Sequence, residues 1–197
     1  MNKNINKVKD NNINKDNKVN KDNKDNKDLN ILFNSYQGVR IDIGCGGNKQ
    51  PNWIGMDIRK IDGVDIVWDV QDIPYPIPDN SCFQILLSHL WEHIEPKYRI
   101  KMMDELWRIM KHEGQLLISV PYYLSFGACQ DPTHYTCPNE ATFTYFDPGY
   151  PMYNIYKPKP WKLKRNDYQL NGNLEVILEA QKITSNDNKS VTTNDKK

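Results

Sequence analysis

The feature that most constrains the fold is an apolar run that ends in an acid and a glycine-rich turn. The run covers residues 39–47, in which Asp42 is followed by Gly44 and Gly46. A second short apolar run at 54–58 contains another acid, Asp57. Glycines after a strand let the backbone turn sharply and approach a ligand closely. The pattern is typical of a nucleotide-type site at the edge of a parallel sheet, where the second acid can accept ribose hydroxyls.

Further apolar runs predict more strands of the same sheet. They lie at 64–68, 84–88 and 115–120, after the first two strands at 39–43 and 53–58. Apolar residues at helical spacing between 100 and 110 predict a helix before the fifth strand, with Gly114 at its stop. Strands that alternate with crossovers indicate a doubly wound α/β fold, in which the carboxyl ends of the strands meet at one ligand-binding edge.

The glycine turn favours one kind of nucleotide ligand over two others. Lys49 stands where a dinucleotide fingerprint has its third glycine, and Asp57 comes too early for a full crossover helix. No phosphate-binding P-loop sequence is present. A carboxylate at Asp42, two residues before Gly44, would repel a pyrophosphate and attract an ammonium group. These residues favour S-adenosylmethionine as the ligand.

Several segments in order carry a resemblance to a known family. The chain is similar to class I S-adenosylmethionine-dependent methyltransferases of the small-molecule, type 11-like kind over about residues 39–121. The matching segments are 42–47, 55–58, 68–75, 78–83, 88–94 and 105–121. The sequence departs from the family in a short first crossover containing Pro51 and in Asn48 at the usual third glycine.

The resemblance implies a complete fold and a set of ligand-binding residues. It implies a Rossmann-like, mostly parallel seven-stranded sheet whose antiparallel last strand comes from a hairpin at 161–180 with Gly172 in its turn. It implies that Asp42 holds the glycine loop and the methionine ammonium, that Asp57 binds the ribose, and that Asp69 and Val70 contact the adenine. The predicted donor-binding residues are Asp42, Gly44, Cys45, Gly46, Asp57, Ile58, Asp69, Val70 and Ser88. Neighbouring acids at 62, 65 and 72 leave the assignment of Asp69 open.

Methyl transfer needs an in-line acceptor in a dry pocket, and a general base helps if the acceptor is a hydroxyl. We predict His134 as the first candidate for this base, with Asp131 orienting its ring. His89, at the end of the predicted fourth strand, is the second candidate. Either histidine could instead make a structural hydrogen bond.

Composition divides the chain into three parts. Residues 1–28 and 185–197 are rich in Asn, Lys and Asp and poor in apolar residues, which predicts disordered tails. Residues 29–184 form the predicted methyltransferase domain. Within it, the aromatic segment 122–160 is predicted to be a lid or substrate loop. Its Tyr and Phe side chains could form either an acceptor pocket or a small core.

The charge distribution disfavours nucleic acid as a partner. Residues 1–28 have a net charge of +3 and residues 185–197 of +1, so the formal total of +1 leaves −3 on the part between them. A nucleic-acid binder usually has a basic footprint, and residues 88–91 lack the signature of DNA amino-methylating enzymes. We therefore expect a small-molecule acceptor and no DNA, and the oligomeric state stays open.

Other features indicate the compartment and the absence of a metal. No apolar run approaches the length of a membrane span or a secretory signal, and the four cysteines are scattered, which predicts a cytoplasmic protein with reduced thiols. Cys129, His134 and Cys137 lack a paired Cys-x-x-Cys, so no metal site is predicted. Two alternative functions stay open: a non-catalytic S-adenosylmethionine-binding module and a nicotinamide-dependent oxidoreductase.

Overall fold

A computed structural model of the chain describes residue 33 and residues 39–182. Contacts divide the chain into a unit up to residue 37 and a unit from residue 38 onward, and the fold below is that of the second unit. The predicted tails at 1–28 and 185–197 lie outside the described residues. None of the described helices is long and apolar enough to cross a membrane.

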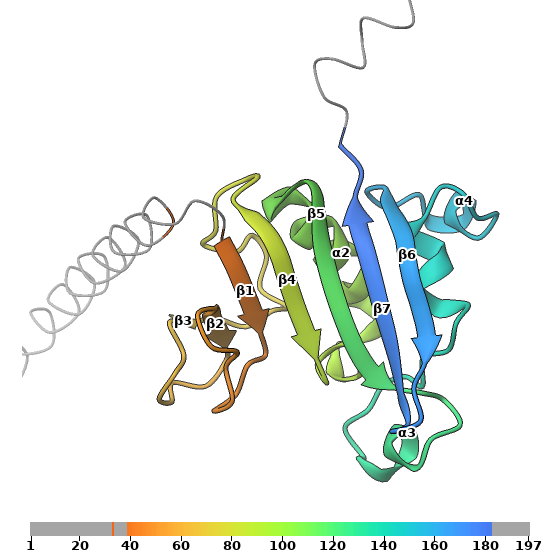
Figure 1. Ribbon diagram of the computed structural model, residues 1–197, viewed down its shortest axis with the longest axis horizontal. Coiled ribbons are helices and arrows are strands. Elements are labelled where there is room, and N and C mark those ends of the chain that lie inside the picture. The colour runs from red at the N-terminus through yellow and green to blue at the C-terminus, as the bar shows by residue number, and fades with distance from the viewer. Residues whose placement is uncertain (1–32, 34–38, 183–197) are drawn as a thin grey trace, which may run out of the picture. The chain divides into compact units, whose positions relative to one another are not determined.

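A seven-stranded sheet organises this unit, with the strand order β3-β2-β1-β4-β5-β7-β6 (Figure 1). The strands are β1 (Val39–Ile43), β2 (Ile54–Asp57), β3 (Ile66–Val67), β4 (Cys82–Ser88), β5 (Met110–Pro121), β6 (Trp161–Tyr168) and β7 (Asn173–Ala180). β1 to β5 are parallel, and β7 is antiparallel to both β5 and β6. The predicted mostly parallel sheet with an antiparallel last strand is confirmed.

Helical segments follow β4 and β5. They are η1 (Trp91–His93), α2 (Pro96–Ile109), α3 (Phe126–Gln130), η2 (Thr142–Phe146) and α4 (Tyr153–Tyr156). α2 begins with a proline in its first turn, where the missing N–H has no helical partner to lose. It buries Met102, Met103, Leu106 and Ile109, which recur at helical spacing.

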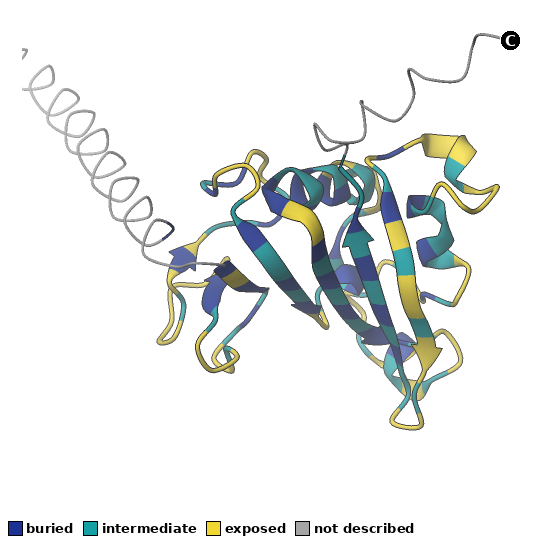
Figure 2. Ribbon diagram, turned by 45° about the horizontal axis from the view of Figure 1, so that its top comes forward, coloured by how far each residue is buried: buried dark blue, intermediate teal, exposed yellow. Residues whose placement is uncertain are grey.

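The core lies between α2 and one face of the sheet. Ile41, Ile85, Leu116 and Leu178 are paired in successive strands and are completely buried. Figure 2 shows buried residues alternating with half-buried ones along the central strands. This alternation is the period of two expected for strands with one covered face.

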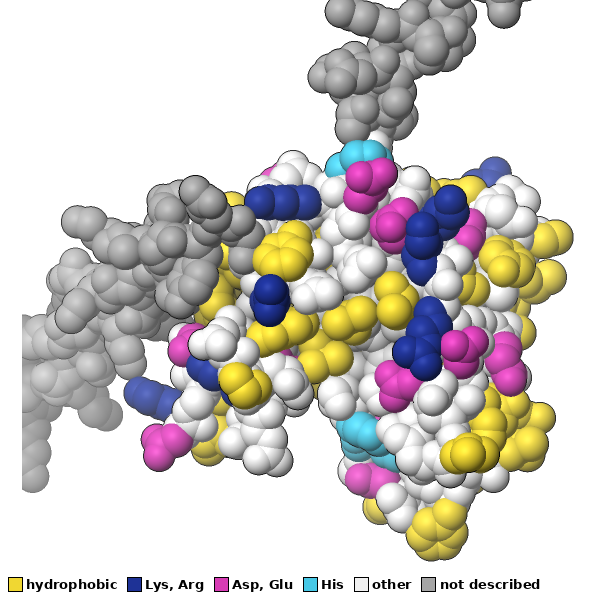
Figure 3. Space-filling view, viewed as in Figure 1, with side chains coloured by type: hydrophobic (Ala, Val, Ile, Leu, Met, Phe, Trp, Pro, Cys, Tyr) yellow, Lys and Arg dark blue, Asp and Glu magenta, His cyan; other side chains and the backbone are white. Residues whose placement is uncertain are grey.

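The opposite face of the sheet has little helical cover within the described part of the chain. α2 lies behind the sheet in the view of Figure 1, and residues 44–81 contain no helix. Leu86, Leu117 and Ile177 form a half-buried row on this second face. Figure 3 shows hydrophobic side chains over the middle of it with charged side chains around them.

Two local predictions differ from the structure. Gly114 does not stop the helix, because α2 ends at Ile109 and β5 already begins at Met110, which pairs with Cys82. Residues 110–114 therefore belong to the strand and not to the helix. The predicted third strand at 64–68 is reduced to Ile66–Val67 at the edge of the sheet. Gly172 does lie in the β6–β7 turn, with a φ of 95° that favours glycine.

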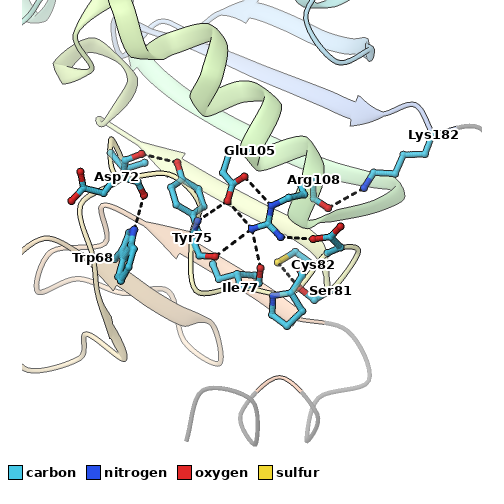
Figure 4. A network of polar contacts seen from close by, with 12 residues as sticks. Trp68, Asp72, Tyr75, Ile77, Ser81, Cys82, Glu105, Arg108 and Lys182 are labelled. Atoms are coloured by element: carbon cyan, nitrogen blue, oxygen red, sulfur yellow. Dashed lines mark hydrogen bonds and ion pairs between the residues drawn. The ribbon is translucent and has the colours of Figure 1, made fainter. Parts of the chain in front are cut away.

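A buried polar network joins α2 to the connection between β3 and β4 (Figure 4). Glu105 of α2 is 5% exposed and accepts hydrogen bonds from Tyr75 N at 2.6 Å and from Arg108 Nε at 2.8 Å. Arg108 also donates to the carbonyl oxygen of Ile77 at 3.0 Å. The Tyr75 hydroxyl donates to the carbonyl oxygen of Val70 at 2.8 Å. The network thereby fixes the segment that carries Val70.

Candidate active site

The glycine turn after β1 packs against β2 and the segment after β4. Gly44 and Gly46 have φ values of 73° and 54°. The amides of Gly44 and Cys45 donate to the carbonyl oxygen of Met56 at 2.7 and 3.3 Å. A Cβ on Gly44 would lie 3.0 Å from Leu90 Cδ1. Both the positive φ and the close approach of Leu90 therefore favour glycine at position 44.

Asp42 lies beneath this turn. Its side chain is 3% exposed, and its Oδ2 accepts a hydrogen bond from Gln50 N at 3.0 Å. Burial raises the pKa of Asp42, against the lowering effects of the Gln50 hydrogen bond and the nearby Lys49 charge. The Asp42 carboxylate is thus tied to the backbone of the segment that follows the turn.

Asp57 ends β2 and holds the turn from the other side. Its Oδ2 accepts from Gly46 N at 2.9 Å, and its Oδ1 accepts from the Arg59 amide at 2.9 Å and from Arg59 Nε at 3.0 Å. Burial acts to raise the pKa of Asp57, but the hydrogen bonds from Arg59 and Gly46 outweigh it and hold the pKa below its ordinary value. The carboxylate is thus ionised at neutral pH and faces a largely exposed partner, since the Arg59 side chain is 61% exposed.

A cavity of about 160 Å³ lies beside Asp57. It brings together many of the predicted donor-binding residues: Gly44, Asp57, Ile58, Asp69 and Val70. Its other lining residues are Ile43, Met56, Trp68, Gln71, Leu90, His93 and Ile94. We call it the donor cleft, after the ligand predicted for these residues from the sequence.

The remaining predicted donor residues lie outside the lining of this cleft. Asp42 and Gly46 support the turn, Ser88 is exposed at the end of β4, and Cys45 is buried. Burial, together with the charges of Asp42 and Asp57, raises the pKa of Cys45 to about 11, so its thiol stays protonated.

A larger cavity of about 650 Å³ lies at the carboxyl end of β5. Its lining includes both predicted bases, His89 and His134, together with Glu92 and Asp131. His93 lines this cavity and the donor cleft alike. The two cavities therefore share a wall, and we call the larger one the acceptor cavity, after the bases predicted from the sequence that line it.

His89 is held in an unusual backbone conformation, with a φ of 52°. Its Nδ1 lies 3.3 Å from Glu92 Oε1, and its Nε2 lies 3.3 Å from Asn173 Nδ2. The Glu92 contact raises the pKa of His89 above its ordinary value, against the lowering effect of burial. His89 thus faces a buried carboxylate on one side and the start of β7 on the other.

His134 is oriented differently from the sequence prediction. Asp131 does not hold its ring: Asp131 Oδ1 accepts hydrogen bonds from the amide and hydroxyl of Thr133 at 2.8 and 2.7 Å. His134 Nδ1 instead lies 3.0 Å from the carbonyl oxygen of Ala128. His134 is therefore held by the backbone carbonyl of Ala128 in α3, although Asp131 is nearer to it in the sequence.

The aromatic segment 122–160 is partly core and partly cavity lining. Phe143 and Phe146 are buried against Trp91, with ring centroids 5.3 and 5.8 Å apart from it. Phe126 is 86% exposed and lines the acceptor cavity. Phe143 and Phe146 thus form part of a small core, and the acceptor pocket stays a prediction for the segment's cavity-lining side chains.

Some lining residues were not predicted. Glu92 is the most notable, because it is completely buried yet lines the acceptor cavity. Glu92 follows the predicted fourth strand, and its position at the ligand-binding edge of the sheet is the sequence feature that could have identified it. The contact of Thr133, which lines neither cavity, with His93 was also not predicted, since it joins segments far apart in the chain.

No protein-family model and no curated protein sequence matches the chain. Solved structures do match it. A SAM dependent methyltransferase from Archaeoglobus fulgidus is 15% identical, covering 78% of this chain and 94% of its own, with a TM-score of 0.55. The antibiotic-resistance methyltransferase Kmr is 16% identical, covering 79% and 93%, with a TM-score of 0.53. A putative type 11 methyltransferase from Sulfolobus solfataricus is 19% identical, covering 79% and 90%, with a TM-score of 0.50.

The fold is that of class I methyltransferases. In this methyltransferase fold the carboxyl ends of the parallel strands form the ligand edge. The donor cleft lies at that edge, where β1, β2 and β3 end.

Proposed function

We propose that the protein is an S-adenosylmethionine-dependent methyltransferase that moves a methyl group to an oxygen or nitrogen of a small or exposed acceptor. The observation that carries the proposal is the shared wall between the donor cleft and the acceptor cavity. A methyl displacement requires the donor carbon and the acceptor atom in line and in contact. Two cavities that have the lining residue His93 in common support such an arrangement.

The donor cleft suits an adenosine ligand with a charged amino-acid end. Asp57 is placed for the ribose hydroxyls once the exposed Arg59 side chain moves aside. Ile58, which is 63% exposed, and the buried Val70 offer apolar contact to an adenine ring, and Asp69 offers an acceptor for its amino group. Asp42, beneath the turn, supplies the negative charge that favours the methionine ammonium.

The structure disfavours a nicotinamide dinucleotide as the ligand. Dinucleotide sites place the pyrophosphate at the N-terminus of the helix that follows the glycine turn. Residues 44–53 contain no helix here, and the turn stands between the carboxylates of Asp42 and Asp57. The oxidoreductase alternative therefore lacks its phosphate site.

His134 is the first candidate for assisting removal of the acceptor proton, and His89 is the second. Both line the acceptor cavity. The −3 charge of the central part supports a small acceptor over DNA. Four free cysteines agree with a cytoplasmic location.

Calorimetry with the purified chain tests the proposal. We expect binding of S-adenosylmethionine and of its demethylated product, and no binding of NAD. Tight NAD binding without donor binding would reject the proposal. A methyl-labelled donor incubated with a metabolite extract then separates an enzyme from a non-catalytic binding module, because only the enzyme transfers label.

A further inference from the structure

The wall of the acceptor cavity holds a cluster of one carboxylate and two imidazoles. Its members are Glu92, His93 and His134, and one ligand atom of each lies within 4.8 Å of those of the others. Glu92 and His93 come from η1, and His134 comes from the segment after α3. The amide of Tyr135 donates to the carbonyl oxygen of Glu92 at 2.8 Å and ties the two segments together.

Glu92 is in an unusual state for a carboxylate. Its side chain is 0% exposed, and neither of its oxygens has a hydrogen-bond partner within the described ranges. Its nearest cationic group is His89 Nδ1, at 3.3 Å. A buried carboxylate is strongly unfavourable unless a cation or a proton compensates it. His89 Nδ1 faces only Oε1 of Glu92, and a cation bound at the cluster would compensate the carboxylate as a whole.

Hydrogen bonds to the two imidazoles leave the same nitrogen free on each ring. His134 Nδ1 faces the carbonyl oxygen of Ala128 at 3.0 Å, so Nδ1 must carry the proton and donate it. The hydroxyl of Thr133 donates to Asp131 Oδ1 at 2.7 Å and therefore accepts from His93 Nδ1 at 2.9 Å. The neutral form of each ring therefore presents Nε2 as the nitrogen with a free lone pair. Histidines that ligate metals are held by their other nitrogen in this way.

We propose that Glu92, His93 and His134 bind a divalent transition-metal ion of the zinc type, with its open position toward the acceptor cavity. Two imidazoles and a carboxylate suit Zn²⁺ and related ions, whereas Mg²⁺ and Ca²⁺ prefer oxygen ligands. Metal–ligand bonds of about 2.0–2.2 Å at tetrahedral angles bring the ligand atoms to roughly 3.4 Å from one another. The cluster would therefore contract around the ion.

The sequence predicted no metal site because it offered only Cys129, His134 and Cys137 as candidates. In the structure the two cysteine sulfurs lie 3.9 Å from each other, and the carboxylate and second imidazole come from η1. Only the fold brings residues 92 and 93 next to residue 134.

A metal ion at this site would activate a hydroxyl group of the methyl acceptor. This step rests on the proposed function. An acceptor hydroxyl that binds the ion loses its proton to water more readily. Its oxygen then forms a bond to the methyl carbon while the carbon–sulfur bond breaks, and the sulfonium becomes a neutral thioether. The site thus selects an acceptor that presents an oxygen, and His134 serves as a ligand.

Metal binding can be measured without any acceptor. The untagged full chain is stripped with a chelator and titrated with Co²⁺, and its visible absorption is followed. We expect one Co²⁺ per chain, displaced by Zn²⁺ and not by excess Mg²⁺. Wild-type protein that binds neither Co²⁺ nor Zn²⁺ would overturn the proposal.

Variants assign the ligands. Glu92→Gln and His134→Ala should each weaken Co²⁺ binding at least tenfold, and Thr133→Val should weaken it about tenfold through His93. His112→Ala is the matched control, since His112 lies away from the cluster beside Lys182 and should bind Co²⁺ as the wild type does. Unchanged affinity in both ligand variants, or equal loss in His112→Ala, would contradict the assignment.

Thermal unfolding separates a ligand from a residue that merely supports the fold. Metal-free Glu92→Gln should melt no lower than metal-free wild type, because the substitution removes a buried charge whose one ion-pair partner among the described residues is the half-exposed His89. Zn²⁺ should raise the melting temperature of the wild type and leave that of Glu92→Gln unchanged. A metal-free variant that melts well below the wild type would show instead that Glu92 has a structural role.

Donor calorimetry on the same metal-free samples distinguishes the two proposals. Donor binding by a protein that never binds Co²⁺ overturns the metal site and leaves the proposed function standing. Co²⁺ binding by a protein that never binds the donor supports the metal site and rejects the methyltransferase.

Discussion

Asp57 shows how a single carboxylate can serve both the fold and a ligand. One of its oxygens receives the Gly46 amide, which is part of the turn, while Arg59 provides a side chain that is largely in solvent. Arg59 is the exposed member of this pair, whereas the Asp57 side chain is only 6% exposed. Ribose hydroxyls that replace the Arg59 side chain must therefore supply new hydrogen bonds to the buried carboxylate, while the bond to Gly46 keeps it in place.

Asp57→Ala should weaken donor binding by about 1–3 kcal/mol, because ribose hydroxyls would be left without an acceptor in the cleft. The change is measured by calorimetry with S-adenosylmethionine. Asp62→Ala, at an exposed acid nearby, is the control and should bind as the wild type does. An unchanged dissociation constant for Asp57→Ala would reject the ribose assignment.

His134→Ala should reduce turnover by roughly 10²–10⁴ if the acceptor is a hydroxyl, whether the histidine acts as a base or holds an ion. Donor affinity should stay as it is, because His134 lines the acceptor cavity and not the donor cleft. Loss of donor binding would place His134 in the cofactor site or the fold. Undiminished turnover would make His89 the better candidate.

Residue types at strand ends could be predicted well from the sequence, whereas contacts between distant segments could not. Asp42, Asp57 and Asp69 follow apolar runs, so their position at the sheet edge needed only the strand pattern. The link from Asp131 through Thr133 to His93 depends on how residues 131–134 pack on η1. No spacing in the sequence encodes that packing.

At the scale of elements, α2 does more than cover the sheet. Its buried Glu105 and the adjoining Arg108 hold the β3–β4 connection through backbone and side-chain hydrogen bonds (Figure 4). The contact with Glu105 raises the pKa of Arg108 above its ordinary value, against the lowering effect of burial, so the guanidinium stays charged. Because Val70 lies in that connection, the helix indirectly shapes the donor cleft.

Arg108→Ala should destabilise the protein by about 3 kcal/mol, because it leaves the Glu105 charge buried without its main partner. Urea unfolding measures the change. Arg165→Ala offers a matched control: its pair with Asp167 is exposed on both sides and should contribute less than about 1 kcal/mol. Equal losses of unfolding free energy in the two variants would show that the buried network stabilises the protein no more than an exposed ion pair does.

Strands were easier to predict than helices in this chain. Buried parallel strands such as β4 appear as continuous apolar runs, and each predicted strand forms. The stop of α2 was missed because the sequence signal at Gly114 competes with the pairing of Met110 and Cys82, which is a long-range contact. The pairing of distant strands outweighs the local tendency of Gly114 to end a helix.

On the scale of the whole molecule, composition distinguishes a central part that can form a core from terminal segments with few apolar residues. Deleting residues 1–28 should leave the melting temperature and the donor affinity unchanged, because that segment has few side chains able to join a core. Thermal unfolding and calorimetry of the shortened chain provide the check. A large drop in melting temperature would show that the segment contributes to the fold.

The helix-free connections around β2 and β3 carry a consequence for the lifetime of the protein. Segments with few packed elements open locally at a lower free energy than the core, and an open segment is what a protease cleaves. A ligand that binds only the closed form suppresses that opening in proportion to its concentration. Limited proteolysis between β2 and β4 should therefore slow as S-adenosylmethionine is added, and a rate unaffected by the donor would refute this. The rate at which the protein is degraded would then fall as the concentration of its methyl donor rises.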